Sequence, residues 1–220
     1  AAAALVALAV VVGAGVALGQ ARVARAEADK AAAVNDFLVG LLGAADPTAD
    51  GRDVRVASLL DQAAASLDSV FAGQPDVAAT LRQTLGTTYH NLGLYEEADE
   101  QFSRSLAVRE RLYGARHRDV AEARNALGLL QLDRGDNAAA DSLLSLALAS
   151  ARPTVPRTDG LLADILGNLG YVRFLDGDLD ASLALHRESV ERMQALPDAD
   201  PVEVAAGMGN VAIVLGNQGK

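Results

Sequence analysis

Residues 85–121 read LGTTYHNLGLYEEADEQFSRSLAVRERLYGARHRDVA, and the pattern in this stretch is the main indication of the fold. Its hydrophobic residues recur at three- and four-residue steps, as one face of an α-helix requires, and a second such series starts at Tyr95. Gly93 separates the two series and Gly114 follows the second, because glycine easily adopts the left-handed conformation that ends many helices. The stretch therefore predicts a helix-turn-helix hairpin. Asp76 is the expected N-cap of its first helix.

The pattern returns every 42 residues along the chain. Three sets of positions keep this spacing without an insertion: Gly93, Gly135, Gly177 and Gly219; Leu85, Leu127, Leu169 and Val211; and Gly86, Gly128, Gly170 and Ala212. A fixed period of this length predicts a stacked solenoid. The expected repeats are residues 79–120, 121–162, 163–204 and a truncated 205–220. Further helices are expected from Asp119 to Asp133, Asn137 to Ser150, Asp159 to Asp176, Asp178 to Ala195 and Pro201 to Gly216.

Small residues at matching positions predict that the two helices of each hairpin lie close together. On the first helix these residues are Gly86, Gly128, Gly170 and Ala212, and on the second helix they are Ala98, Ala140 and Ser182. A bulky side chain at these places would splay the hairpin.

The quoted stretch resembles tetratricopeptide repeats of the 42-residue variety found in kinesin light chains and many bacterial proteins. The resemblance covers residues 79–220 and rests on signature positions in the first copy, namely Leu85, Gly86, Tyr89, Gly93, Tyr95, Ala98 and Phe102. The later copies depart from it, since Asn137 and Leu179 replace the tyrosine, and Leu144 and His186 replace the phenylalanine. The resemblance implies a superhelix of antiparallel helix pairs.

The concave face of such a superhelix is lined by the first helix of every repeat and is used for binding. Asparagine amides can both donate to and accept from a peptide backbone, and in the kinesin-type family asparagines of this helix hold extended peptides. The expected lining of the concave face is Gln83, Thr87, His90, Asn91, Asn125, Leu129, Asn168, Tyr171, Phe174, Asn210, Ile213 and Asn217.

Residues 1–19 form an uncharged, hydrophobic run. As a helix the run would extend roughly 28 Å, close to a hydrocarbon core of about 30 Å, so we expect a single transmembrane helix. Gly15 and Gly19 are spaced as a small-xxx-small pair that lets two such helices approach, which would make the chain a homodimer.

Two alternatives to the transmembrane helix are open. The glycines of this run also resemble a dinucleotide-binding loop of an oxidoreductase, but Leu18 stands where the third glycine of that fingerprint belongs. The other alternative is a cleaved secretory leader, with a mature N-terminus near Ala21, although no basic n-region or Ala-x-Ala site is visible.

Residues 20–42 have apolar residues at three- and four-residue steps and are expected to form a helical juxtamembrane stalk. A coiled-coil seam is the alternative, which Lys30 in its centre weakens. Residues 43–78 are expected to be a loop followed by a helix from Val54 to Phe71 that caps the first repeat.

The order of span, stalk, loop, helix and repeats is similar to the C-terminal half of bacterial transmembrane serine/threonine protein kinases. That resemblance implies a kinase domain ahead of residue 1, a single-pass protein of the bacterial inner membrane, and repeats on the extracytoplasmic side. A signalling adaptor with the same repeats is the alternative.

Composition limits the partners and the chemistry. The formal net charge of −10 and the sequence pI of about 4.7 disfavour nucleic acid and favour a basic or neutral protein or peptide. There is no cysteine, and the histidines lack metal-ligand spacing. The run DGDLDA from Asp176 fails as a calcium loop, because Ala181 and Arg187 replace its required glycine and glutamate, so Asp178 is expected to be an N-cap. We expect an all-α chain with no metal, no cofactor and no catalytic residues of its own.

Overall fold

The computed structural model describes residue 37, residues 56–156 and residues 159–219. The predicted transmembrane helix with Gly15 and Gly19, the loop up to residue 55 and all of the stalk except Phe37 lie outside the described residues. Among the described helices, none has the length and apolar character needed to cross a membrane.

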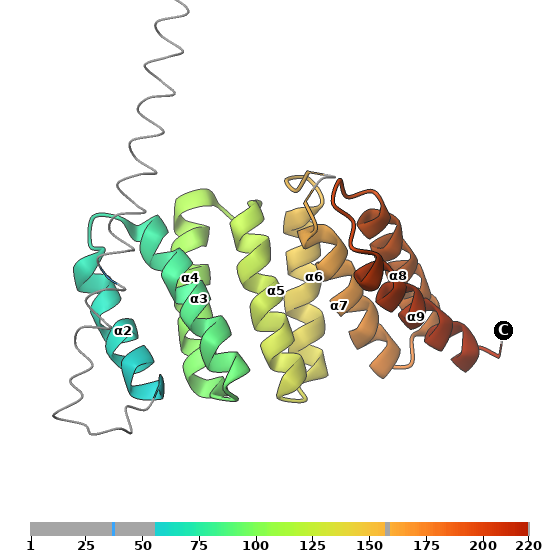
Figure 1. Cartoon of the computed structure of the whole chain (residues 1–220), viewed down its shortest axis with the longest axis horizontal. Helices are drawn as coiled ribbons and strands as arrows, with labels where there is room; N and C mark the ends of the chain where they lie inside the picture. Colours follow the sequence, from blue (N-terminus) through green and yellow to red (C-terminus); the bar gives the residue numbers. More distant parts are fainter. Residues whose placement is uncertain (1–36, 38–55, 157–158, 220) are drawn as a thin grey trace, which may run out of the picture. The chain divides into compact units, whose positions relative to one another are not determined.

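The chain divides into two compact units, residues 1–70 and residues 71–220. The first unit contains α2 (Val56–Val70), which agrees with the helix expected from Val54 to Phe71. The second unit contains seven helices (Figure 1): α3 (Pro75–Asn91), α4 (Tyr95–Tyr113), α5 (Arg118–Asp133), α6 (Asn137–Ala151), α7 (Leu161–Leu175), α8 (Leu179–Gln194) and α9 (Pro201–Asn217). All regular secondary structure in the described residues is helical, so the all-α prediction is confirmed for this part of the chain.

The first residues of the helices agree with the predicted N-caps at α8 and differ from them at α3. The Asp178 side chain accepts a hydrogen bond from the Ala181 backbone N–H and caps α8, as predicted. Asp76 is not the N-cap of α3, because the helix already begins at Pro75 and Asp76 falls in its first turn. Proline is favoured at this first helical position, where its missing N–H has no helical partner to lose.

Two further helices begin at other residues than predicted. Helix α5 begins one residue before Asp119, and His117 is its N-cap, accepting through Nδ1 from the Asp119 backbone N–H. Helix α7 begins two residues after Asp159, whose carboxylate accepts from the Leu161 backbone N–H.

The four glycines spaced by 42 residues occupy equivalent bends. Gly93, Gly135, Gly177 and Gly219 have φ angles of 75°, 82°, 80° and 72°. At the first bend the Gly93 N–H donates to the His90 carbonyl and the Leu94 N–H to the Tyr89 carbonyl, both at 2.9 Å. This pair of bonds is a Schellman motif, which requires the left-handed conformation at the glycine. The predicted turn is therefore confirmed.

The small residues allow the close helix pairing that the sequence predicts. A Cβ added to Gly86 would lie 2.5 Å from the Phe102 ring, and one added to Gly128 would lie 2.7 Å from the Leu144 side chain. From the opposite side, Ala98, Ala140 and Ser182 are fully buried.

Serine hydroxyls join the helices at buried positions. Ser182 Oγ donates to the Gly170 carbonyl at 2.8 Å, and Ser105 Oγ donates to the Ala79 carbonyl at the same distance. Ser189, two repeats after Ser105, donates to the Ala163 carbonyl at 2.7 Å. Each bond satisfies a hydroxyl that would otherwise be costly to bury.

Neighbouring hairpins pack on each other in chain order, α4 on α5, α6 on α7 and α8 on α9. Between the second and third hairpins the core consists of fully buried aliphatic residues such as Ala121, Ala147, Ile165 and Leu166. Each hairpin thus covers its apolar face with the next one, as a solenoid requires.

Candidate functional site

A groove of about 630 Å³ lies on the first helices of three successive repeats. It is formed by α5, α7 and α9, with the second helix α8 contributing part of its wall. Its lining residues are Asn125, Leu129, Leu132, Ala163, Asp164, Gly167, Asn168, Tyr171, His186, Ser189, Met193, Glu203, Ala206, Gly207 and Asn210. Five residues that the sequence analysis placed on the concave face line this groove: Asn125, Leu129, Asn168, Tyr171 and Asn210.

The first helices of the second and third repeats run parallel and in register. The Asn168 Nδ2 group donates to the side-chain oxygen Oδ1 of Asn125 at 3.1 Å, and Arg118 Nε donates to Asp159 Oδ2 at 2.6 Å. These contacts join residues 43 and 41 positions apart, so the 42-residue offset is kept along the helices.

The groove residues fall into three groups, called rows here, by their chemistry and their position along the helices. On α7, Asp164, Asn168 and Tyr171 are spaced by four and three residues and share one helix face. The acidic row consists of Asp164 and Glu203, the amide row of Asn125, Asn168 and Asn210, and the apolar row of Leu129, Leu132 and Tyr171.

The amide row retains hydrogen-bonding capacity. The bond between Asn168 and Asn125 uses one donor of the first and one acceptor site of the second. Each of these amides has two N–H donors and a carbonyl with two lone pairs. Asn210 is exposed. The row can therefore bond further groups that enter the groove.

The acidic row carries uncompensated negative charge within the described part of the chain. Neither Asp164 nor Glu203 takes part in an ion pair with another described residue. Burial, together with the nearby carboxylates of Glu203 and Asp159, raises the pKa of Asp164 above its ordinary value. A cation placed beside Asp164 would favour the ionised carboxylate and would therefore lower this pKa again.

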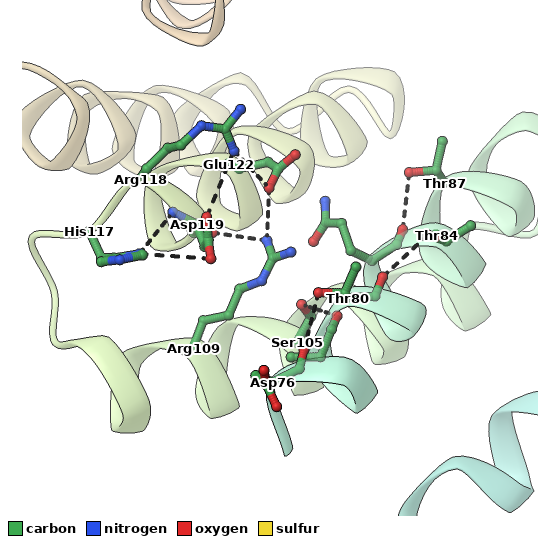
Figure 2. Close-up of polar contacts among 12 residues, drawn as sticks. Asp76, Thr80, Thr84, Thr87, Ser105, Arg109, His117, Arg118, Asp119 and Glu122 are labelled. Carbon is green, nitrogen blue, oxygen red and sulfur yellow. Dashed lines mark hydrogen bonds and ion pairs between the residues drawn. The ribbon is translucent and has the colours of Figure 1, made fainter. Parts of the chain in front are cut away.

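The equivalent acid on the first helix of the preceding repeat has arginine neighbours. Glu122 precedes Asp164 by 42 residues, and its carboxylate lies 3.3 Å from Arg109 Nη1 and 3.6 Å from Arg118 Nη1 (Figure 2). Arg109 is buried and also donates to the Asp119 carbonyl at 2.9 Å. The charge of Glu122 is thus balanced by the protein itself.

Small residues form much of the groove surface, and α8 supports it. Gly167 and Gly207 lie on α7 and α9, where an added Cβ would lie 3.4 Å from Ser189 Oγ and 3.0 Å from Val190 Cγ2 of α8, so both glycines allow α8 to pack closely. The His186 ring packs 3.0 Å from the place that a Cβ on Gly170 would occupy, and burial lowers the pKa of His186. His186 therefore has the packing position that the repeat pattern predicts.

The remaining predicted concave residues lie outside this groove. In the first repeat, the Thr87 hydroxyl donates to the Gln83 carbonyl of its own helix at 3.1 Å (Figure 2). His90 Nε2 lies 2.6 Å from Asp133 Oδ2 on the next repeat. The residues that do not line the groove are Gln83, Thr87, His90, Asn91, Phe174, Ile213 and Asn217.

Ten lining residues were not predicted from the sequence, namely Leu132, Ala163, Asp164, Gly167, His186, Ser189, Met193, Glu203, Ala206 and Gly207. The spacing contained a signal for two of them. Asp164 precedes Asn168 by four residues and Glu203 precedes Asn210 by seven, so each shares a helix face with a predicted residue. Within residues 56–156 and 159–219, no group of His, Asp or Glu side chains is arranged to hold a metal ion.

Comparison with known proteins agrees with this architecture. Residues 76–152 match the family model of the tetratricopeptide repeat. The helices of the second unit, α3 to α9, have a tetratricopeptide-like superhelical fold. No curated protein sequence matches the chain significantly.

Solved structures show the same fold at low identity. The crystal structure of BtubC (BKLC) from P. vanneervenii has a TM-score of 0.67 at 19% identity, over 79% of this chain and 69% of that one. A candidate kinesin light chain from Podosopora anserina, with nearly identical TPR-like repeats, has a TM-score of 0.55 at 17% identity. That similarity covers 74% of this chain and 81% of the other.

Proposed function

We propose that the repeats are a protein-interaction scaffold that holds an extended segment of a partner protein in the groove on α5, α7 and α9. The observation that carries this proposal is the amide row, in which Asn125, Asn168 and Asn210 line one groove from three successive first helices. Stacked repeats of this kind use such an extended concave surface for binding.

The chemistry of the groove suits a peptide backbone. An extended peptide presents N–H and C=O groups that lose their water when it is bound, and each unpaired group would cost binding free energy. An asparagine amide can pair with either kind of group and carries no charge. The exposed Tyr171 adds an aromatic surface of the sort enriched at binding hot spots.

The proposal is tested by selecting peptides from a displayed library of random peptides on the purified chain. The triple variant Asn125→Ala, Asn168→Ala, Asn210→Ala is expected to bind the selected peptides roughly tenfold or more weakly, because several hydrogen bonds are lost together. The matched control is Asn91→Ala with Asn217→Ala, two exposed asparagines outside the groove, which should retain binding. Failure to select any peptide, or equal binding by the triple variant, would contradict the proposed function.

We also propose that the scaffold is anchored in the membrane through residues 1–19, followed by the stalk of residues 20–42. The uncharged run and its length support the anchor. A fusion of residues 1–45 to a soluble reporter should then stay in the membrane pellet after carbonate extraction. A reporter found in the supernatant would favour the nucleotide-binding alternative.

The same order of segments supports a further proposal, that the scaffold is the extracytoplasmic sensor or recruitment part of a serine/threonine protein kinase. The residues encoded ahead of Ala1 are the direct test. Kinase catalytic-loop signatures are expected there, and their absence would favour an adaptor without a kinase.

A further inference from the structure

We infer that the groove selects an extended segment whose side chains alternate between basic and apolar residues. This inference rests on the proposed function, since it specifies which peptides the groove would hold. Its basis is the juxtaposition of the three rows in one groove: the amide row has a member on each of α5, α7 and α9, the acidic row lies on α7 and α9, and the apolar row lies on α5 and α7.

The order of the rows follows from the helix positions. On α7 the acidic residue Asp164 comes first, Asn168 one turn later and Tyr171 about one further turn on. On α9 Glu203 comes about two turns before Asn210, one turn ahead of Ala206, which occupies the position equivalent to Asp164. The amide row therefore lies between the acidic row and the apolar row.

A ligand that follows the groove crosses the helices from one repeat to the next. With its backbone on the amide row, an extended peptide directs successive side chains to opposite sides. One side chain then points to the acidic row and the next to the apolar row. This geometry favours a partner sequence in which basic and apolar residues alternate.

The width of the groove sets the length of that segment. Packed helices lie about 8–10 Å apart, so three neighbouring first helices span roughly 20 Å. An extended chain advances about 3.3 Å per residue, which corresponds to about six residues. Three of these side chains would face the acidic row and three the apolar row.

Charge complementarity determines the residues on one side. Glu122 is balanced by Arg109 and Arg118, whereas Asp164 and Glu203 have no cation beside them among the described residues. Lysine or arginine side chains of a partner would supply the missing charge.

Apolar contacts determine the residues on the other side. Leu129 and Leu132 are half-buried, and Tyr171 is 48% exposed. Valine, leucine or isoleucine side chains of the partner would remove this surface from water. Ile213, which is 54% exposed, occupies the position equivalent to Tyr171 in the 42-residue period, although it is not among the residues that line the groove.

The experiment compares three synthetic octapeptides, two of them with the same composition, by calorimetric titration on the full chain. The probes are an alternating lysine-valine peptide, a block isomer with four lysines followed by four valines, and an alternating glutamate-valine peptide. The alternating lysine-valine peptide should bind roughly tenfold more tightly than its block isomer, and the glutamate peptide should show no binding. Equal binding of the two lysine peptides would overturn the inference.

Two double variants test whether the acidic row causes the preference for the alternating lysine-valine peptide. Asp164→Asn with Glu203→Gln should reduce binding of the alternating lysine peptide to the level of the block isomer. The matched control removes the same charge outside the groove, at the exposed residues Glu100 and Glu191 of second helices, as Glu100→Gln with Glu191→Gln. The control should retain the preference, and an equal loss in both double variants would contradict the inference.

The outcomes separate this inference from the function on which it rests. If library-selected peptides bind through the asparagines but show no basic-apolar alternation, the inference fails and the proposed function stands. If no peptide from the library binds, the proposed function itself fails.

Discussion

Gly86 of α3 and Phe102 of α4 are in such close contact that a Cβ on the glycine would lie 2.5 Å from the phenylalanine ring. Leu144 and His186 take the place of this ring in the next two repeats, opposite Gly128 and Gly170. The contact therefore recurs with a different side chain each time. The feature common to the three repeats is the glycine on the first helix, which leaves room for the side chain opposite it.

Gly86→Ala is expected to destabilise the chain by about 2 kcal/mol, because the added methyl group forces the Phe102 ring out of a packed core. The free energy of unfolding from denaturant titration is the measurement. Gly209→Ala is the matched control, since that helical glycine has no atom within 4 Å of a built Cβ. The control should gain a fraction of a kcal/mol from helix propensity, roughly 0.5–1, and an equal loss in both variants would refute the packing explanation.

Gly135→Ala tests the turn rather than the packing. No atom lies within 4 Å of a Cβ built on Gly135, but its φ of 82° is one that side chains disfavour. The expected cost is about 1 kcal/mol in thermal or chemical unfolding. Gly73→Ala serves as the control, because Gly73 is equally open and lacks the positive φ. An unaffected Gly135 variant would show that the bend does not depend on glycine.

The period of 42 residues allowed the hairpins, their turns and the close helix contacts to be predicted from sequence, because each depends on local spacing. Helix starts were less predictable: at Asp76 the carboxylate suggested a cap, but Pro75 fixes the first turn one residue earlier. The cap at Asp178 was predicted correctly since its glycine turn and its helix are adjacent in sequence.

The candidate site was predictable only in part, because equivalent positions in a repeat need not have equivalent neighbours. Thr87 occupies the position of Leu129 and Tyr171, yet its hydroxyl bonds to its own helix and the groove does not reach it. Glu122 and Asp164 are likewise equivalent, and only the first has arginines beside it. Such differences arise from residues on other helices, which the period does not reveal.

His186→Leu should flatten the pH dependence of stability on the acid side. Burial lowers the pKa of His186 in the folded chain, so the unfolded state binds the proton more readily. Stability is therefore expected to fall as the pH drops below the ordinary histidine value of 6.5, until the lowered folded pKa is reached. Leucine already occupies this position in the preceding repeat, as Leu144.

The measurement is the free energy of unfolding between pH 7.5 and about 5 for the wild type and the leucine variant, in a range where His titrates and most carboxylates do not. The wild type should lose more stability than the variant across this range. Identical slopes would mean that the histidine ring is accessible to protons in the folded chain.

Hydrogen exchange of the full chain, with and without a library-selected peptide, shows where a bound segment lies on the repeats. A segment bound in the groove should slow the exchange of backbone amides in α7 and α9, whose residues form two of its three first helices. The account predicts added protection there and at the facing part of α5, and none in α3 and α4. Protection confined to α3 and α4, or to the second helices alone, would contradict it.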